Sequence, residues 1–162
     1  MRVVQWLLVV SAALFVSGIG LVVAGARTAR AGTPAVEAPL TTPVASVKQI
    51  MNGIVLPDAY VIYNAVSTIS TAKGVEEKAP QNDEEWAVIG NAAAAVAESG
   101  NLLLMGDRAI DKGDWVKMTR DFMDAAKRSL DAANKKDKEA IVAAGGDLNT
   151  TCDNCHAKYQ RQ

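Results

Sequence analysis

The sequence has few of the residues on which structural zinc sites and disulfide frameworks depend. Its 162 residues include one histidine, His156, and two cysteines, Cys152 and Cys155. A structural zinc site usually takes four ligands from two separated Cys or His pairs, and this chain has no second pair. It also has no block of basic residues, and its formal net charge is −1. This charge pattern argues against nucleic acid as a partner.

The first 31 residues have the features of an export signal. Arg2 precedes a long apolar stretch from Trp6 to Ala26, and Ala29-Arg30-Ala31 has the small-x-small pattern of a signal-peptidase site. Cleavage there would leave a chain with 14 basic and 18 acidic residues, a formal charge of −4. An uncleaved membrane anchor is the alternative, because the 21 residues of the apolar stretch would span about 31 Å as a helix. In both cases we expect the folded part to be periplasmic, and membrane-bound only if the segment is retained.

The remaining chain predicts a short leader, residues 32–42, followed by one all-α domain, residues 43–162. Apolar residues recur at spacings of three and four in four segments, and no segment has the period of two expected of a strand. The first helix is predicted to begin at Thr42-Pro43 and to extend as far as Ile69, with a kink at Pro57. A loop is expected at residues 73–82.

The other three helices are predicted from their caps. The second starts near Asp83, the third is capped by Asp114 and closes at residues 134–136, and the fourth extends from about Asp137 to Tyr159. Four helices with short connections favour an antiparallel four-helix bundle, and the core of such a bundle commonly holds a cofactor.

The motif Cys152-Asp153-Asn154-Cys155-His156 indicates which cofactor. C-x-x-C-H is the attachment sequence of c-type haem. On a helix these two cysteines and the histidine share one face, so both thiols can form thioethers while the His156 imidazole reaches the iron. A redox dithiol would be expected to open a helix in a βαβ unit, and a disulfide within one helical turn would constrain the unfolded chain little. We therefore predict one covalently attached haem c.

A haem would also complete the core of the predicted bundle. Aromatic residues are only 5% of the sequence, and alanine is abundant. Helices with such small side chains would pack thinly by themselves, whereas a buried macrocycle would fill the space between them.

With these residues in place, the chain resembles the class II cytochromes c, a family that includes cytochrome c′ and has C-x-x-C-H near the C-terminus of a four-helix bundle. The resemblance covers about residues 44–160. It rests on Val47-Lys48-Gln49-Ile50-Met51, on Trp115, and on Gly145-Gly146-Asp147-Leu148 ahead of Cys152 to Tyr159. It implies periplasmic electron transfer with a protein redox partner that the sequence does not identify, and homodimers formed through the first two helices.

The resemblance leaves open what lies opposite His156. Low-spin members of the family use a methionine of the first helix as the second iron ligand, and the matching position here is Met51. Cytochromes c′ instead leave the iron five-coordinate and bind nitric oxide or carbon monoxide, in which case Met51 would be a packing residue, as methionine often is. Many cytochromes c′ have a basic residue four positions after the histidine, where this chain has Gln160. This difference favours the electron-transfer branch.

We expect an electron carrier rather than an enzyme. The only histidine is already assigned to the iron, and no distal residue suited to acid–base catalysis is evident. Tyr159 matches an aromatic position of the family, where packing near the haem is implied.

Overall fold

The computed structural model describes residues 2–12, 14–15 and 41–160. The chain forms two compact units, Met1–Leu40 and Thr41–Gln162. In the first unit, residues 2–12 and 14–15 are helical. Within the described part of the chain, no helix combines the length and the apolar character that a membrane crossing requires. Most of the predicted apolar stretch, the cleavage motif at residues 29–31 and the leader up to residue 40 lie outside the described residues.

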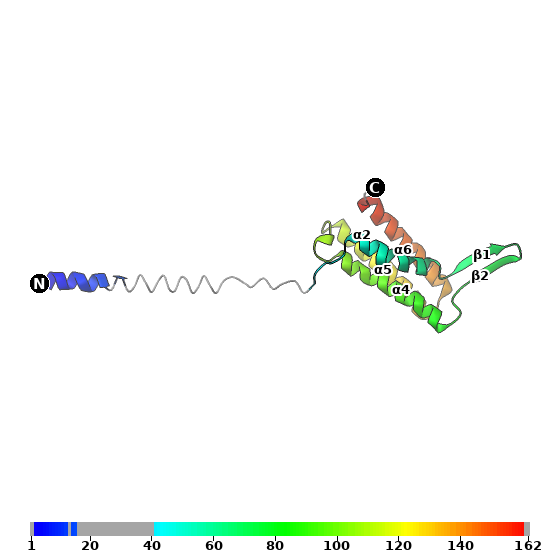
Figure 1. The fold of residues 1–162 in the computed structure, drawn as a ribbon, viewed down its shortest axis with the longest axis horizontal. Helices are drawn as coiled ribbons and strands as arrows, with labels where there is room; N and C mark the ends of the chain where they lie inside the picture. The colour runs from blue at the N-terminus through cyan, green and yellow to red at the C-terminus, as the bar shows by residue number, and fades with distance from the viewer. Residues whose placement is uncertain (1, 13, 16–40, 161–162) are drawn as a thin grey trace. The chain divides into compact units, whose positions relative to one another are not determined.

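The second unit is mostly helical (Figure 1). Its elements in chain order are α2 (Val47–Ile50), the π-helix η1 (Met51–Val55), α3 (Leu56–Tyr63), β1 (Ser67–Thr71), β2 (Gly74–Lys78), α4 (Asp83–Leu103), the 3₁₀-helix η2 (Gly106–Arg108), α5 (Asp114–Lys135) and α6 (Lys138–Tyr159). Helix α4 packs against α3 and α5, and α6 packs against α5 and α3. The all-α prediction is confirmed at the level of packed helices.

The first helix begins later than predicted. Its N-cap is Ser46, whose hydroxyl accepts a hydrogen bond from the Gln49 amide at 3.2 Å. The Gln49 side chain in turn accepts one from the Ser46 amide at 2.9 Å. This reciprocal capping box satisfies two amides that would otherwise lack partners. The prediction from Thr42-Pro43 was therefore wrong, because a stronger capping pair follows a few residues later.

A π-turn takes the place of the predicted kink at Pro57. The Leu56 amide bonds to the Met51 carbonyl, five residues back, and Pro57 follows in the first turn of α3. Proline has no amide hydrogen and its ring crowds the carbonyl four residues earlier, so an ordinary helical turn is disfavoured there. The wider turn places Ile50 and Val55, which are five residues apart, both in the core. Ile54, which lies between them, is only half-buried.

A β-hairpin that the sequence did not predict lies between α3 and α4. Strands β1 and β2 pair antiparallel, with Ile69 opposite Glu76 and Thr71 opposite Gly74. Ile69 thus lies in a strand and not on the first helix, and the region predicted as a loop contains β2. Apart from Ser67, which is half-buried, all residues of the two strands are exposed. Such a hairpin gives no hydrophobic alternation, because neither face packs on a core.

The later helices have nearly the predicted bounds. Asn82 caps α4 through its side chain, which accepts from the Glu85 amide. Helix α5 differs at its start, because Asp111, not Asp114, accepts from the Gly113 and Trp115 amides at 2.8 and 3.1 Å. Lys136 ends α5 in the left-handed region, with φ of 55°.

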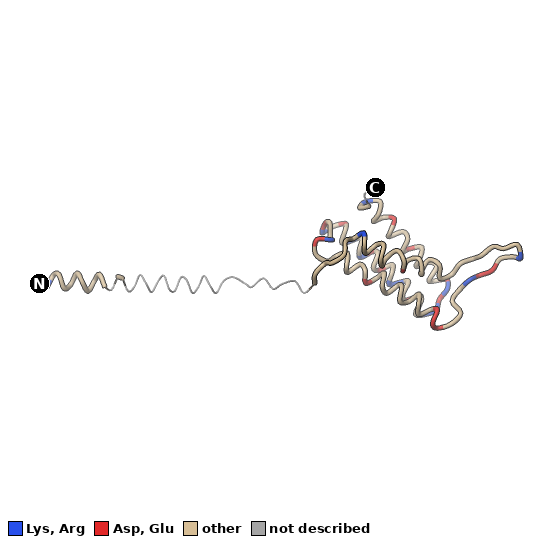
Figure 2. The backbone as a smooth tube through the Cα atoms, in the orientation of Figure 1, with Lys and Arg blue, Asp and Glu red and all other residues tan. Residues whose placement is uncertain are grey.

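Small side chains dominate the core of the second unit. Eight alanines on the four longest helical segments are buried, and Val96, Ser99, Ser129, Ile141 and Leu148 are the largest side chains that are almost fully buried. Among the described residues no charged side chain is buried, and residues of both signs are interspersed along the helices (Figure 2). The alanine-rich core expected from the composition is present.

Candidate functional site

Helix α6 carries the whole C-x-x-C-H motif near its C-terminal end. Asp137 caps the helix by accepting from the Ala140 amide at 2.9 Å, and the helix continues without a break to Tyr159. Ile141, Gly145 and Leu148 are buried, and the two cysteines continue their face as half-buried residues, whereas His156 is exposed. The structure therefore brings Cys152, Cys155 and His156 together on one helix.

Both thiols are free rather than joined in a disulfide. Burial raises the pKa of the Cys152 thiol, and the nearby charge of Asp153 adds to the effect. Burial also raises the pKa of the Cys155 thiol, with a further contribution from Cys152. A catalytic dithiol has the opposite property, a lowered pKa at a helix N-terminus. The position near the negative end of the α6 dipole is equally unsuited to a reactive thiolate.

Tyr63 is a site residue that the sequence analysis missed. Its hydroxyl lies 4.0 Å from the Cys152 sulfur. Burial raises the pKa of Tyr63 well above its ordinary value, and Cys152 adds to the increase, so the phenol stays protonated and can donate to the sulfur. The sequence feature that comes nearest to indicating this contact is Gly145. A Cβ at this position would lie 3.6 Å from the Tyr63 ring and 3.8 Å from Ile62. Gly145 thus gives α3 a close approach to α6 beside the motif.

The end of α6 that follows His156 is fixed by the start of α5. The Tyr159 ring packs edge-to-face on Trp115, with ring centroids 5.1 Å apart, and its hydroxyl donates to the Asp111 carboxylate. Lys158 pairs with Asp114. Trp115 also donates from its ring nitrogen to the Leu103 carbonyl at 3.0 Å. Tyr159 therefore has a defined structural role that connects α6 to the ends of α4 and α5.

Met51 lies on another element, as the first residue of η1. It is half-buried and packs against the same hydrophobic cluster as Cys152 and Tyr63. Two other methionines lie on α5, where the Met123 side chain occupies the space over Gly100 of α4. Met123 is thus committed to the α4–α5 contact, and Met51 remains a candidate for a second iron ligand.

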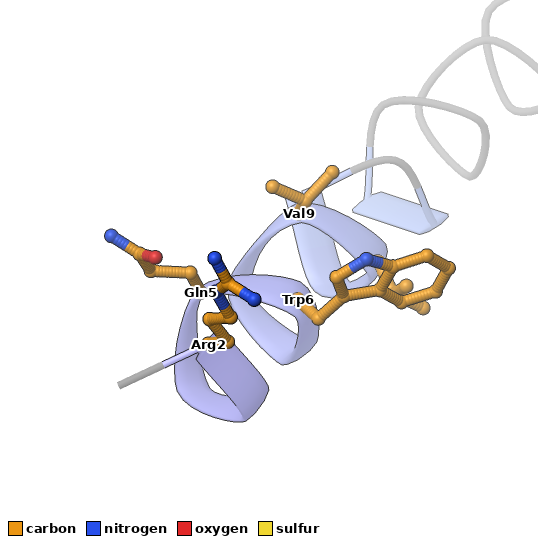
Figure 3. A pocket seen from close by; sticks show the side chains of 5 residues that line it. Arg2, Gln5, Trp6 and Val9 are labelled. Carbon is orange, nitrogen blue, oxygen red and sulfur yellow. The ribbon is translucent and has the colours of Figure 1, made fainter.

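A hollow of about 300 Å³ lies beside the helix of the first unit, lined by Arg2, Gln5, Trp6, Val9 and Val10 (Figure 3). All five side chains come from one helix of the predicted export signal, so we assign no chemistry to it. Over residues 2–12, 14–15 and 41–160, no group of three or more His, Cys, Asp or Glu side chains is arranged to hold a bare metal ion.

Comparisons with protein-family models, with curated proteins and with solved structures find no match. The resemblance to class II cytochromes c therefore depends on the motif, on its place in the last helix, and on the order of the other matching residues.

Proposed function

We propose that the protein is an exported, monohaem c-type cytochrome of the class II kind that transfers electrons in the periplasm. The observation that carries the proposal is the arrangement on α6. Two free, half-buried thiols and an imidazole lie within five residues of one helix, which suits covalent attachment of one haem at Cys152 and Cys155 with His156 as iron ligand. The proposal includes an antiparallel four-helix bundle, and the contacts of α4 with α3 and α5, and of α6 with the same two helices, support it.

The residues of the chain fit such a group. The Tyr63 hydroxyl beside Cys152 places a donor next to one attachment sulfur, and Cys152 itself packs against the hydrophobic cluster, beside which a macrocycle would pack. The anchoring of Tyr159 and Lys158 on α5 keeps the turn containing His156 from fraying. When bound, haem c supplies a one-electron iron couple whose potential depends on its axial ligands. In the proposed carrier, His156 and Met51 would hold the iron, His156 through its imidazole and Met51 through its thioether sulfur.

A second candidate function is the binding of nitric oxide or carbon monoxide at a five-coordinate iron. The packing of Met51 against the hydrophobic cluster favours it, because a methionine held by apolar neighbours can crowd the iron without binding it.

Covalent attachment is tested on protein purified from a host that exports and matures c-type cytochromes. We expect haem absorbance to stay with the polypeptide on a denaturing gel, and to be lost in a Cys152→Ser, Cys155→Ser variant. Asp153→Asn, which changes the motif but no attachment atom, is the matched control. A wild-type polypeptide without bound haem would overturn the proposal.

The ligand question is tested by optical spectra of the ferric and ferrous protein, recorded before and after addition of carbon monoxide. A low-spin spectrum that becomes high-spin in Met51→Ala, but not in Met123→Ala, supports the electron carrier. Rapid carbon monoxide binding to a high-spin ferrous protein supports the second candidate and excludes Met51 as ligand.

A further inference from the structure

The β-hairpin is the most exposed folded element of the second unit and extends away from the helices (Figure 1). Its base is held to α6 by an ion pair between Glu77 of β2 and Lys138, at 3.0 Å. Ile69 on β1 and Val75 on β2 are both large apolar residues in solvent, 46% and 74% exposed. An isolated two-stranded hairpin is marginally stable in water, so a protruding hairpin of this kind gains from additional strand pairing.

The two edges of the hairpin differ in charge. Strand β1 has the sequence Ser-Thr-Ile-Ser-Thr and carries no charge, whereas β2 contains Glu76, Glu77 and Lys78 (Figure 2). Proteins usually protect a free edge with charged residues, proline or a bulge. None of these is present in β1, so its edge is open to pairing with another strand.

The register defines which backbone groups of β1 are free. The closing pair of the hairpin is Thr71 with Gly74, across a two-residue turn, so Ser67, Ile69 and Thr71 direct their amides and carbonyls toward β2. Thr68 and Ser70 consequently direct theirs away from β2, to the open edge.

The pattern of residue types in β1 is unchanged when the strand is reversed, with hydroxyl residues at the four outer positions and Ile69 at the centre. In an antiparallel pair of two β1 strands centred on Ile69, Thr68 would face Ser70 of the second copy, Ser67 would face Thr71, and Ile69 would face Ile69. The hydrogen-bonded positions would be Thr68 and Ser70, the same residues whose backbone groups are free. Hydroxyl pairs and apolar pairs are favourable across strands, and no like charges meet.

We propose that the open edge of β1 is a homodimer interface, at which two copies of this chain pair their β1 strands antiparallel about Ile69 to form a four-stranded sheet. This interface is distinct from the helix-mediated dimer implied by the family resemblance, and it does not depend on haem binding. A five-residue edge buries less than the 1,200–2,000 Å² or so of a standard stable interface, so the dimer is concentration-dependent.

The first test is sedimentation of the exported, processed protein between low micromolar and near-millimolar concentration. We expect the average mass to rise toward twice the monomer mass. Ile69→Lys should abolish the rise, because two lysines would face each other at the two-fold axis. Val75→Lys is the matched control, since it adds the same charge on the other strand, and it should dimerise as the wild type does. A protein that stays monomeric throughout, or an Ile69→Lys variant that dimerises equally, would overturn the proposal.

The second test is cross-linking, which reports the register directly. Ile69 would form a non-hydrogen-bonded pair with its own copy, at a Cα separation of about 4.5 Å, within the range that a disulfide bridges. We expect Ile69→Cys to give a covalent dimer that reductant dissolves. Val75→Cys, although more exposed, would be separated from its copy by three strand spacings, roughly 14 Å, and should give none. Equal cross-linking of both variants would indicate random collision and refute the register.

Discussion

Replacing Pro57 with alanine tests what holds the π-turn η1, and with it Met51, in place. The substitution restores an amide that could bond to the Gly53 carbonyl in an ordinary α-helical turn. That hydrogen bond is worth about 0.5–1.5 kcal/mol. Conversion of η1 to α-helix would, however, rotate α2 relative to α3 by about 100° and shift it by about 1.5 Å.

Such a rotation is opposed by the core. Ile50 and Val55 are 2% and 6% exposed, and in an α-helix residues five apart lie about 140° from each other. One of the two would leave the core, at a loss of about 1.5–3 kcal/mol of burial free energy. The burial term exceeds the hydrogen-bond term, so we expect the π-turn to persist in Pro57→Ala.

The assay compares Pro57→Ala, Ile50→Ala and the double variant. Pro57→Ala should change the free energy of urea unfolding by less than about 1 kcal/mol and leave the Leu56 amide protected from hydrogen exchange. Ile50→Ala should lower the free energy of unfolding by about 2–5 kcal/mol. Only the double variant is free to convert to α-helix, and only there should the ferric spectrum show a changed axial ligand. A spectral change in Pro57→Ala alone would contradict this prediction, because it would show that proline, and not the core, holds the turn.

Three further predictions concern the contacts of α6 with the start of α5 and with α3. The hydrogen bond from the Tyr159 hydroxyl is the largest cause of a lowered pKa at Asp111, and the bond from the Trp115 amide is the next largest. Ionised Asp111 therefore stabilises the fold above its unfolded pKa of about 4. That contribution should be lost as the pH falls through the lowered folded value, and Asp111→Asn should flatten the acid limb of an unfolding-midpoint profile; a profile unchanged from wild type would contradict this. Gly145→Leu should lower the unfolding midpoint, because a side chain at 145 meets Tyr63 and Ile62. Gly146→Leu should not lower it, because nothing lies within 4 Å of a Cβ at 146. Equal effects of the two substitutions would be inconsistent with the close approach of α3. Tyr63→Phe should lower the free energy of unfolding by about 0.5–1.5 kcal/mol, measured by urea titration, and no change would mean that the hydroxyl makes no effective bond to the Cys152 sulfur.

The sequence predicted the later helices well because their caps and periods agree. Asn82, just ahead of the predicted start, and Asp137 cap α4 and α6, and the stripe from Ile141 to Leu148 is buried. The placement of Cys152, Cys155 and His156 on one face followed from helical geometry alone. These features are local, so a single sequence is sufficient to predict them.

The features that were missed depend on tertiary packing. The spacing of five between Ile50 and Val55 fits no regular helix and is explained only by the core that both residues enter. The hairpin has no buried face, so β1 shows no alternation. Neither the bond from Tyr159 to Asp111 nor the contact of Tyr63 with Cys152 has a local signature, because the partners are 48 and 89 residues apart.

The position of the candidate axial ligands is therefore determined by two different kinds of contact. The position of His156 depends on α6. This helix is held by polar and aromatic contacts at Trp115 and Asp111 and by the close approach at Gly145. The position of Met51 depends on the π-turn. Pro57 disfavours an α-helical turn there, and the burial of Ile50 and Val55 holds the π-turn in register. The polar contacts of α6 at the start of α5 should keep His156 in position when the core loosens. The position of Met51, in contrast, depends on a few apolar side chains in an alanine-rich interior. Under mild destabilisation we therefore expect Met51 to be displaced before His156, so that the ferric spectrum changes at lower urea concentration than the signal of Trp115. Coincident transitions would show that both sides are held by one cooperative core.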